Sequence, residues 1–244
     1  MIALIIFLVA AVLLLAFTFL RRKSPAVFRK IEAHERLNRA VGLAVEGGTR
    51  LHVSIGRGNL FTARGGSALA GLAMLRRLSE RTSLSDHPPV VTSGDASLAI
   101  LSQDTLQSGY RAAGAEDQYR FTTGRLTGLT PFAFAAGTIP IMRDEKVSAN
   151  VIIGDLGPEA ALLADAADNE NADLIAASDN LAAQSVLYAS SQEPLIGEEL
   201  FAAGAYLGAG KSHEASLQVQ DLLRWLIILA ILGGAALKFL GIGF

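Results

Sequence analysis

Short groups of Gly, Ser and Asp follow several strand-like runs in the middle of this chain, and they are its best candidates for ligand chemistry. The candidate binding residues are Gly56, Gly58, Asp95, Asp155 and Asp179. Because the carboxyl ends of parallel strands line the crevice where α/β proteins bind ligands, these residues would converge on a nucleotide or another small anion. The same residue types also begin helices and fill turns, so helix starts such as Asp95 and Asp179 are the alternative.

Two segments begin or end like phosphate-binding loops, but neither completes its motif. Residues 56–61 start like the dinucleotide fingerprint, yet Phe61 stands where that motif has its third glycine, and the predicted helix opens several residues late. Residues 205–212 end in Gly-Lys-Ser, but Ala205 replaces the first glycine of a phosphate loop and a predicted helix precedes it. We therefore expect no bound cofactor.

Side chains suited to metal binding or nucleophilic catalysis are sparse. His34, His52, His87 and His213 have no paired metal-ligand spacing, and the chain has no cysteine. The Gly-x-Ser-x-Gly sequence that exposes a nucleophilic serine is also missing. We assign no catalytic residue and no metal site, and the sequence favours a protein that is not an enzyme without deciding the question.

Two apolar stretches, residues 2–20 and 222–244, bracket the chain. The first holds 19 residues without a charge, which nearly matches the roughly 30 Å thickness of a bilayer's hydrocarbon core. Basic residues follow it rather than precede it, which indicates an uncleaved anchor rather than a signal peptide. The second stretch has Arg224 and Trp225 at one end and Lys238 near the other, as expected at membrane interfaces, although a buried or interfacial helix would also fit.

Charge is divided unevenly between the membrane-flanking segments and the body. Arg21, Arg22 and Lys23 directly follow the first stretch, so we predict a two-pass protein of a bacterial inner membrane with its middle in the cytoplasm and both termini outside. All 23 acidic residues lie between Glu32 and Asp221, where 14 basic residues leave a formal charge of −9. Such a body is unsuited to nucleic acid, which needs clustered Lys and Arg.

The middle of the chain alternates between short β-rich runs and Ala/Leu-rich helical runs, which predicts an α/β, Rossmann-like domain with a largely parallel sheet flanked by helices. Strands are expected at residues 51–55, 89–92, 119–123, 149–153 and 174–177, and helices at 66–84, 98–114, 158–167, 181–188 and 196–207. Between Leu126 and Asn150 we expect a short buried helix and then a turn at residues 143–146.

Four regions follow from these patterns. Residues 1–22 are the first transmembrane helix, and residues 23–48 form a juxtamembrane helical neck that starts at Ser24-Pro25 and ends at Gly47-Gly48. The soluble α/β domain comprises residues 49–215, and residues 216–244 form the second transmembrane helix with its amphipathic start.

The runs 143–150, 153–159, 192–208 and 218–221 together resemble a family of uncharacterised bacterial membrane proteins. The resemblance covers most of the chain after residue 48. It implies a domain of unknown function with terminal membrane helices, and it supplies no catalytic residue.

Two hypotheses about function remain open. The first is a structural scaffold whose cytoplasmic domain self-associates into a large homo-oligomer at the lipid bilayer. It is favoured by anchoring at both ends, by the small residues at 202–204 and 208, and by Ala230 and Gly234, whose spacing suits helix contact in a bilayer. The alternative is a membrane-tethered sensor or enzyme that binds a nucleotide or small anionic ligand at the strand-end crevice.

Overall fold

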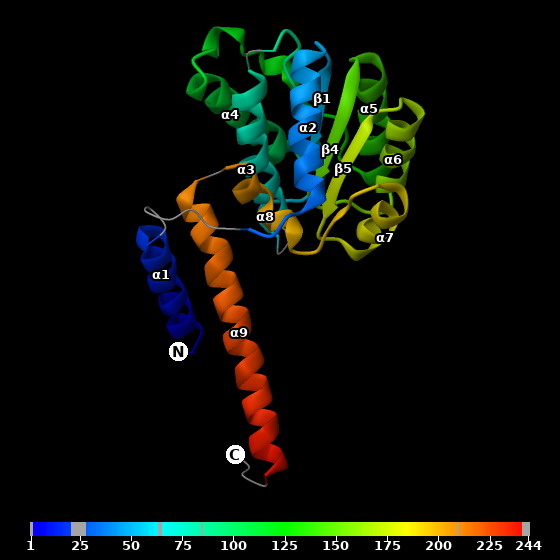
Figure 1. The fold of residues 1–244 in the computed structure, drawn as a ribbon. Coiled ribbons are helices and arrows are strands. Elements are labelled where there is room, and N and C mark those ends of the chain that lie inside the picture. The colour runs from blue at the N-terminus through cyan, green and yellow to red at the C-terminus, as the bar shows by residue number, and fades with distance from the viewer. Residues whose placement is uncertain (1, 21–27, 63–64, 84, 209, 241–244) are drawn as a thin grey trace. The chain divides into compact units, whose positions relative to one another are not determined.

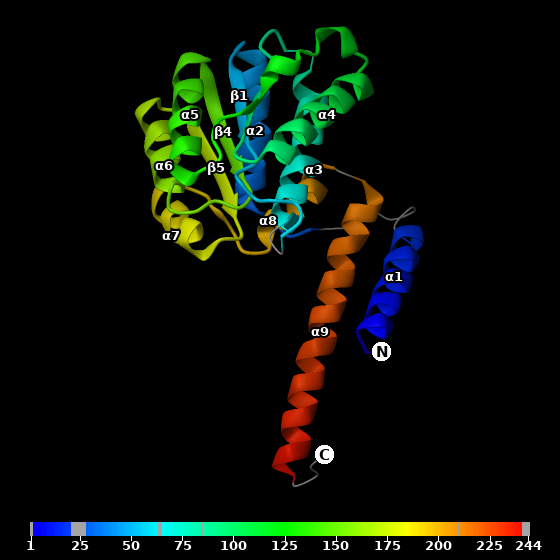
Figure 2. The same ribbon diagram turned by 180° about the vertical axis from the view of Figure 1, so that it is seen from behind.

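The computed structural model describes residues 2–20, 28–62, 65–83, 85–208 and 210–240. The chain divides into two compact units. One is the α/β domain Lys30–Gly208, and the other combines the two ends of the chain, Met1–Arg29 and Ala209–Phe244. Figure 1 shows both units, and Figure 2 shows the same ribbon from behind.

The α/β domain is built on one six-stranded sheet in which all neighbouring strands are parallel. The strand order is β3-β2-β1-β4-β5-β6. The strands are β1 Arg50–Ser54, β2 Val90–Ser93, β3 Gly124–Leu126, β4 Val147–Ile153, β5 Asp173–Ser178 and β6 Leu195–Ile196. This is the order of the doubly wound dinucleotide-binding fold, in which the direction of winding reverses between β1 and β4.

Helices cover both faces of the sheet and bury two apolar clusters (Figures 1 and 2). The first cluster lies under α2 Glu32–Glu46, α3 Gly65–Thr82, α4 Ala96–Ala112 and α8 Glu199–Tyr206. The second lies under α5 Pro131–Asp144, α6 Ala160–Asn169 and α7 Leu181–Ser190. Along β4, Val151 belongs to the first cluster and Ile152 to the second, because successive side chains of a strand point to opposite faces.

The predicted α/β class, parallel sheet and flanking helices are therefore confirmed, with three local differences. The expected strand at residues 119–123 is wrong: those residues include the short 3₁₀ helix Phe121–Thr123, and β3 follows at Gly124. The helix expected from Ile196 begins only at Glu199, because Leu195 and Ile196 pair with β5 as the edge strand β6. The turn expected at residues 143–146 is shorter than predicted: α5 continues to Asp144, and the turn is made by Glu145 and Lys146, with Lys146 at φ 55°.

The expectation of a helical neck at residues 23–48 is corrected. Ser24 and Pro25 lie outside the described residues, and α2 begins at Glu32. Its inward side chains, among them Leu37 and Val41, belong to the first apolar cluster. An apolar stripe on a helix is favourable only where it is buried, so α2 is a core helix of the α/β domain.

The other unit consists of α1 Ile2–Leu20 and α9 Lys211–Phe239, which lie side by side (Figure 1). Among the described helices, α9 alone is long and apolar enough to cross a membrane. Within α1, the apolar segment Ile6–Leu20 is shorter than a membrane-spanning helix needs to be. The structure thus supports one candidate membrane span, at the carboxyl-terminal end.

Candidate functional site

The carboxyl edge of the sheet, where ligands bind in folds of this strand order, is held together by contacts between backbones. Gly56 follows β1 and Gly154 follows β4, with φ of 68° and 129°. A Cβ atom at Gly56 would lie 2.7 Å from the carbonyl oxygen of Asp155, and one at Gly154 would overlap the carbonyl oxygen of Ile55. Both positions need glycine for its positive φ and for this close approach.

Hydrogen bonds between backbones join the strand ends along this edge. The Arg57 N–H donates to the carbonyl of Asp155 at 2.9 Å, and the Gly94 N–H donates to the carbonyl of Gly56 at 2.9 Å. The Gly154 N–H donates to the carbonyl of Ala177 at 3.1 Å. In dinucleotide-binding proteins, backbone N–H groups after the first strand are directed at phosphate oxygens. Here the Arg57 and Gly94 groups are bonded to the chain itself.

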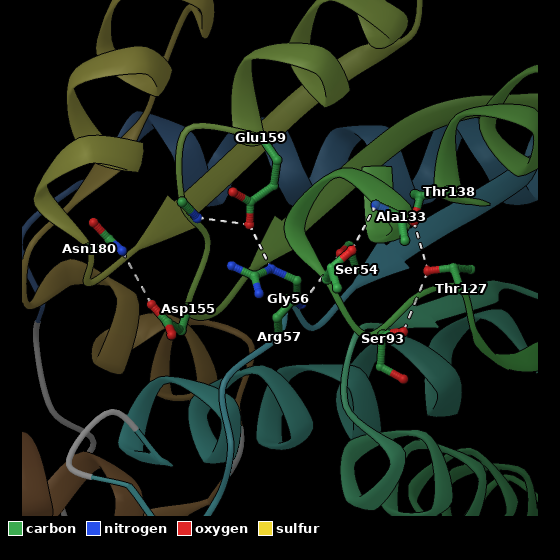
Figure 3. Close-up of polar contacts among 12 residues, drawn as sticks. Ser54, Gly56, Arg57, Ser93, Thr127, Ala133, Thr138, Asp155, Glu159 and Asn180 are labelled. Atoms are coloured by element: carbon green, nitrogen blue, oxygen red, sulfur yellow. Dashed lines mark hydrogen bonds and ion pairs between the residues drawn. The ribbon is translucent and has the colours of Figure 1, made fainter. Parts of the chain in front are cut away.

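The five predicted binding residues lie along this edge, and the structure brings Gly56 and Asp155 into direct contact. Gly58 is buried in the connection after β1. Asp95 adjoins Gly94, and Asp179 adjoins Asn180, whose side-chain amide lies 3.5 Å from the Asp155 carboxylate. All five predicted residues thus lie at the carboxyl edge, and Figure 3 shows two of them, Gly56 and Asp155.

Helix starts account for part of this set. Asp95 is the N-cap of α4, and its carboxylate accepts hydrogen bonds from the backbone N–H groups of Ser97 at 2.9 Å and Leu98 at 3.2 Å. The expected helix start at Asp179 is displaced by one residue, since Asn180 caps α7 by accepting from the Ala182 N–H at 3.0 Å. The capping interpretation is confirmed for Asp95.

An ion pair that the sequence does not reveal lies in the middle of the edge. The Glu159 side chain is buried, and its Oε1 accepts from Arg57 Nε at 2.7 Å and from the Gly157 N–H at 2.9 Å (Figure 3). Burial raises the pKa of this carboxyl, but the Gly157 hydrogen bond and the Arg57 guanidinium outweigh it and lower the pKa below its usual value. No local signal identifies the pair, because its members are 102 residues apart.

Exposed apolar side chains also lie at or soon after the carboxyl ends of β1, β3 and β5. We call this set the apolar rim, and it consists of Phe61, Leu126, Leu129, Phe132 and Leu181. Phe132 is 71% exposed and Leu129 is 67% exposed. Exposed apolar side chains are available for contact with other molecules.

Two histidines are buried inside the domain, where they contact neighbouring polar or aromatic side chains. His52 lies in the centre of the sheet, where its ring nitrogens are each 2.9 Å from a polar atom, Asn150 Oδ1 and Thr92 Oγ1. His34 stacks on Tyr206 with ring centroids 4.4 Å apart. Burial lowers the pKa of each histidine to about 4, so both are neutral at pH 7. No group of three or more His, Cys, Asp or Glu side chains in the described part of the chain is placed to hold a metal ion.

The strand order and the site define a Rossmann-like α/β protein whose carboxyl edge is bonded internally at the point where the winding reverses. The chain belongs to the family described as a domain of unknown function, DUF6754, whose model matches residues 1–243. No curated protein and no solved structure matches the chain. Membership of an uncharacterised family, as the sequence resemblance implied, is thus confirmed.

Proposed function

We propose that this protein is a membrane-anchored scaffold whose α/β domain associates with further copies of itself into a large homo-oligomer. The proposal rests on the hydrogen bonding and the exposed apolar side chains of the carboxyl edge. Its backbone groups at the β1–β4 reversal are bonded to one another, while the apolar rim around it is exposed. An edge of that kind is better suited to contact with another protein surface than to phosphate binding.

A second copy of the chain is the partner that fits this surface best. The body of the chain is acidic, with a formal charge of −9 between Glu32 and Asp221, and it would be repelled by anionic lipid or nucleic acid. The apolar rim carries no charge, so two rims can pack together without burying one. Membrane attachment would also confine the copies to one plane, which raises their effective concentration.

The two outer strands of the sheet are poor sites for association through strand pairing. The outer strands β3 and β6 have three and two residues, which leaves short rows of backbone groups for pairing with another chain. The small residues of α8 were one reason to expect self-association from the sequence. In the structure Ala203 and Gly204 are buried within the domain, so they pack against it rather than against another copy. Association through the connections at the carboxyl edge is therefore the route that we propose.

The same proposal includes attachment to the bilayer by both ends. Helix α9 is the candidate span, and we propose that the apolar α1 beside it makes the second pass, with the domain in the cytoplasm of a bacterial cell and both termini outside. Gly234 of α9 faces open space, where an added Cβ would meet no atom within 4 Å. With Ala230 one turn earlier, it offers a small-residue contact for a neighbouring copy within the bilayer.

The first test is the mass and shape of the intact particle, extracted in mild detergent and imaged by electron microscopy. We expect closed particles many times heavier than the 25.6 kDa chain. Particles that contain a single chain at all detergent and protein concentrations would contradict the proposal.

The second test asks whether the apolar rim holds the particle together. Phe132→Ser should shift the mass distribution towards smaller species, whereas Tyr188→Ser should leave it unchanged. The two aromatic side chains are equally exposed, at 71%, but Tyr188 lies on α7 outside the rim. Equal effects of the two substitutions would remove the rim from the proposal. Circular dichroism of both variants checks that the domain stays folded.

A further inference from the structure

The amino edge of the same sheet, opposite the candidate site, contains a cavity of about 620 Å³. Three arginines from different parts of the domain line it. Arg50 begins β1, Arg125 lies within β3, and Arg120 lies in the irregular segment before β3. A cavity of this size falls within the range of small-molecule binding sites in proteins, roughly 300 to 1,000 Å³.

The two inner arginines are held in place by a single carboxylate. Glu145 accepts from Arg50 Nη1 through one oxygen and from Arg125 Nη2, at 2.7 Å, through the other. The Arg125 Nε donates to the carbonyl of Thr122 at 2.9 Å. Two positive charges therefore share one negative charge, and both guanidinium groups are oriented before any ligand arrives.

One buried donor beside this cavity has no acceptor. The Nε of Arg50 is buried and has no hydrogen-bond partner among the described residues. Tyr110, also part of the lining, is buried, and burial raises its pKa to about 12, so its hydroxyl group stays protonated at neutral pH. An unsatisfied buried donor costs about 1 to 3 kcal/mol.

The acidic side chains of the lining lie at its exposed margin. Asp86 and Asp117 are both exposed to solvent, whereas the side chains of Arg50 and Arg125 are 18% and 34% exposed. The interior of the cavity is therefore positive and its mouth is mixed in charge. That distribution suits a ligand with an anionic group inside and hydroxyl groups outside, since carboxylates accept hydrogen bonds from hydroxyls.

We propose that this amino-edge cavity binds a small soluble molecule that carries a phosphate or diphosphate group, recognised by Arg50, Arg120 and Arg125. Arginine suits this chemistry because its planar guanidinium pairs with two phosphate oxygens at once. The site is independent of the proposed assembly, because it lies at the opposite edge of the sheet from the apolar rim.

Binding of pyrophosphate to the full-length protein in detergent, followed by calorimetry at constant ionic strength, tests the proposal. We expect saturable binding to the unmodified chain. Arg120→Gln should weaken it about tenfold or more, as expected for the loss of a charged hydrogen bond. Arg120 is exposed, so the substitution should leave the fold intact. Arg76→Gln is the matched control, because Arg76 is 58% exposed on α3 and lies outside the cavity lining.

The outcomes separate cleanly. Saturable binding that is weakened by Arg120→Gln and retained by Arg76→Gln supports the site. No saturable binding of pyrophosphate to the folded chain, or equal weakening by both substitutions, overturns it. Succinate serves as a second probe, and binding of succinate without pyrophosphate would overturn the assignment to phosphate. The circular dichroism spectrum of each variant shows whether a loss of binding reflects unfolding.

Discussion

The two edges of one parallel sheet differ in how their connections are built. At the carboxyl edge, Gly56 and Gly154 allow two connections to touch backbone to backbone, and hydrogen bonds join the strand ends. At the amino edge, the chain between α4 and β3 is irregular, and arginine side chains line a cavity. A Rossmann-like strand order therefore does not by itself decide where the arginine-lined cavity forms. The residues at the ends of the strands decide it.

The contrast follows from the chemistry of the residues. Glycine permits close approach of two backbones because it has no side chain. Arginine side chains are long and mutually repulsive, so a group of them needs counter-charges or solvent between its members. At the amino edge Glu145 supplies one counter-charge for two arginines. The remaining charge is what makes that edge a candidate for an anion.

The strongest expected effect is at Gly56. Gly56→Ala should destabilise the domain by about 3 kcal/mol or more, because the new Cβ would meet the Asp155 backbone in addition to the strain of a positive φ. Gly114→Ala is the control, since its φ of 72° matches the 68° of Gly56 but its Cβ would meet nothing within 4 Å. It should cost about 1 kcal/mol. Urea unfolding of both variants would show whether close approach matters, and equal losses would break the comparison.

The next effect is at the buried ion pair. Glu159→Gln should lower the free energy of unfolding by about 2 kcal/mol, since a buried charged hydrogen bond is lost. Glu116→Gln, which removes the charge of an exposed partner of Arg111, should leave it nearly unchanged, since solvent screens exposed ion pairs.

The contribution of Glu159 to the free energy of unfolding should also depend on pH. Its pKa is lower in the folded chain than in the unfolded one, so the stabilisation is present above the usual glutamate pKa and is lost as the pH falls through the folded value. The difference in unfolding free energy between the unmodified chain and Glu159→Gln should therefore shrink on acidification from pH 7 to pH 4 and below. A difference that is constant across this range would contradict the ion pair.

A smaller effect is expected at the cap of α4. Asp95→Ala should destabilise the domain by about 1 kcal/mol, the usual value for a lost N-cap. The same variant should bind pyrophosphate as well as the unmodified chain does, because Asp95 lies at the carboxyl edge. Weaker binding in calorimetry would mean that the two edges are coupled, or that the anion binds at the carboxyl edge.

The last expected change is at Glu145. Glu145→Gln should lower the free energy of unfolding by about 1 kcal/mol, since the amide oxygen still accepts a hydrogen bond from an arginine but the counter-charge shared by Arg50 and Arg125 is lost. Its effect on binding should have the opposite sign: the two freed arginines should bind pyrophosphate several times more tightly. Reduced affinity would show that the carboxylate's role in orienting the arginines outweighs its charge.

Local patterns predicted much of the α/β domain. The alternation of β-rich and helical runs gave the positions of β1, β2, β4 and β5 and of the helices between them, because side-chain periodicity is a property of each segment. The cap at Asp95 and the turn at Lys146 were also local features. The residues at the carboxyl edge were found in the same way, since a glycine or an aspartate lies within two residues of the end of β1, β2, β4 and β5.

Long-range packing decided the rest. The three-residue β3 exists because Gly124 and its neighbours pair with β2, and α2 joined the core because the sheet offered its apolar stripe a surface. The Arg57–Glu159 pair and the arginines of the amino-edge cavity come from segments far apart in the chain. By itself, the sequence determined most of the strands and helices of the α/β domain, the apolar ends and the residues that follow the strands. Only the tertiary structure decided the short edge strands, the backbone contacts at the carboxyl edge and the arginine-lined cavity at the amino edge, because these depend on contacts between residues that no local pattern connects.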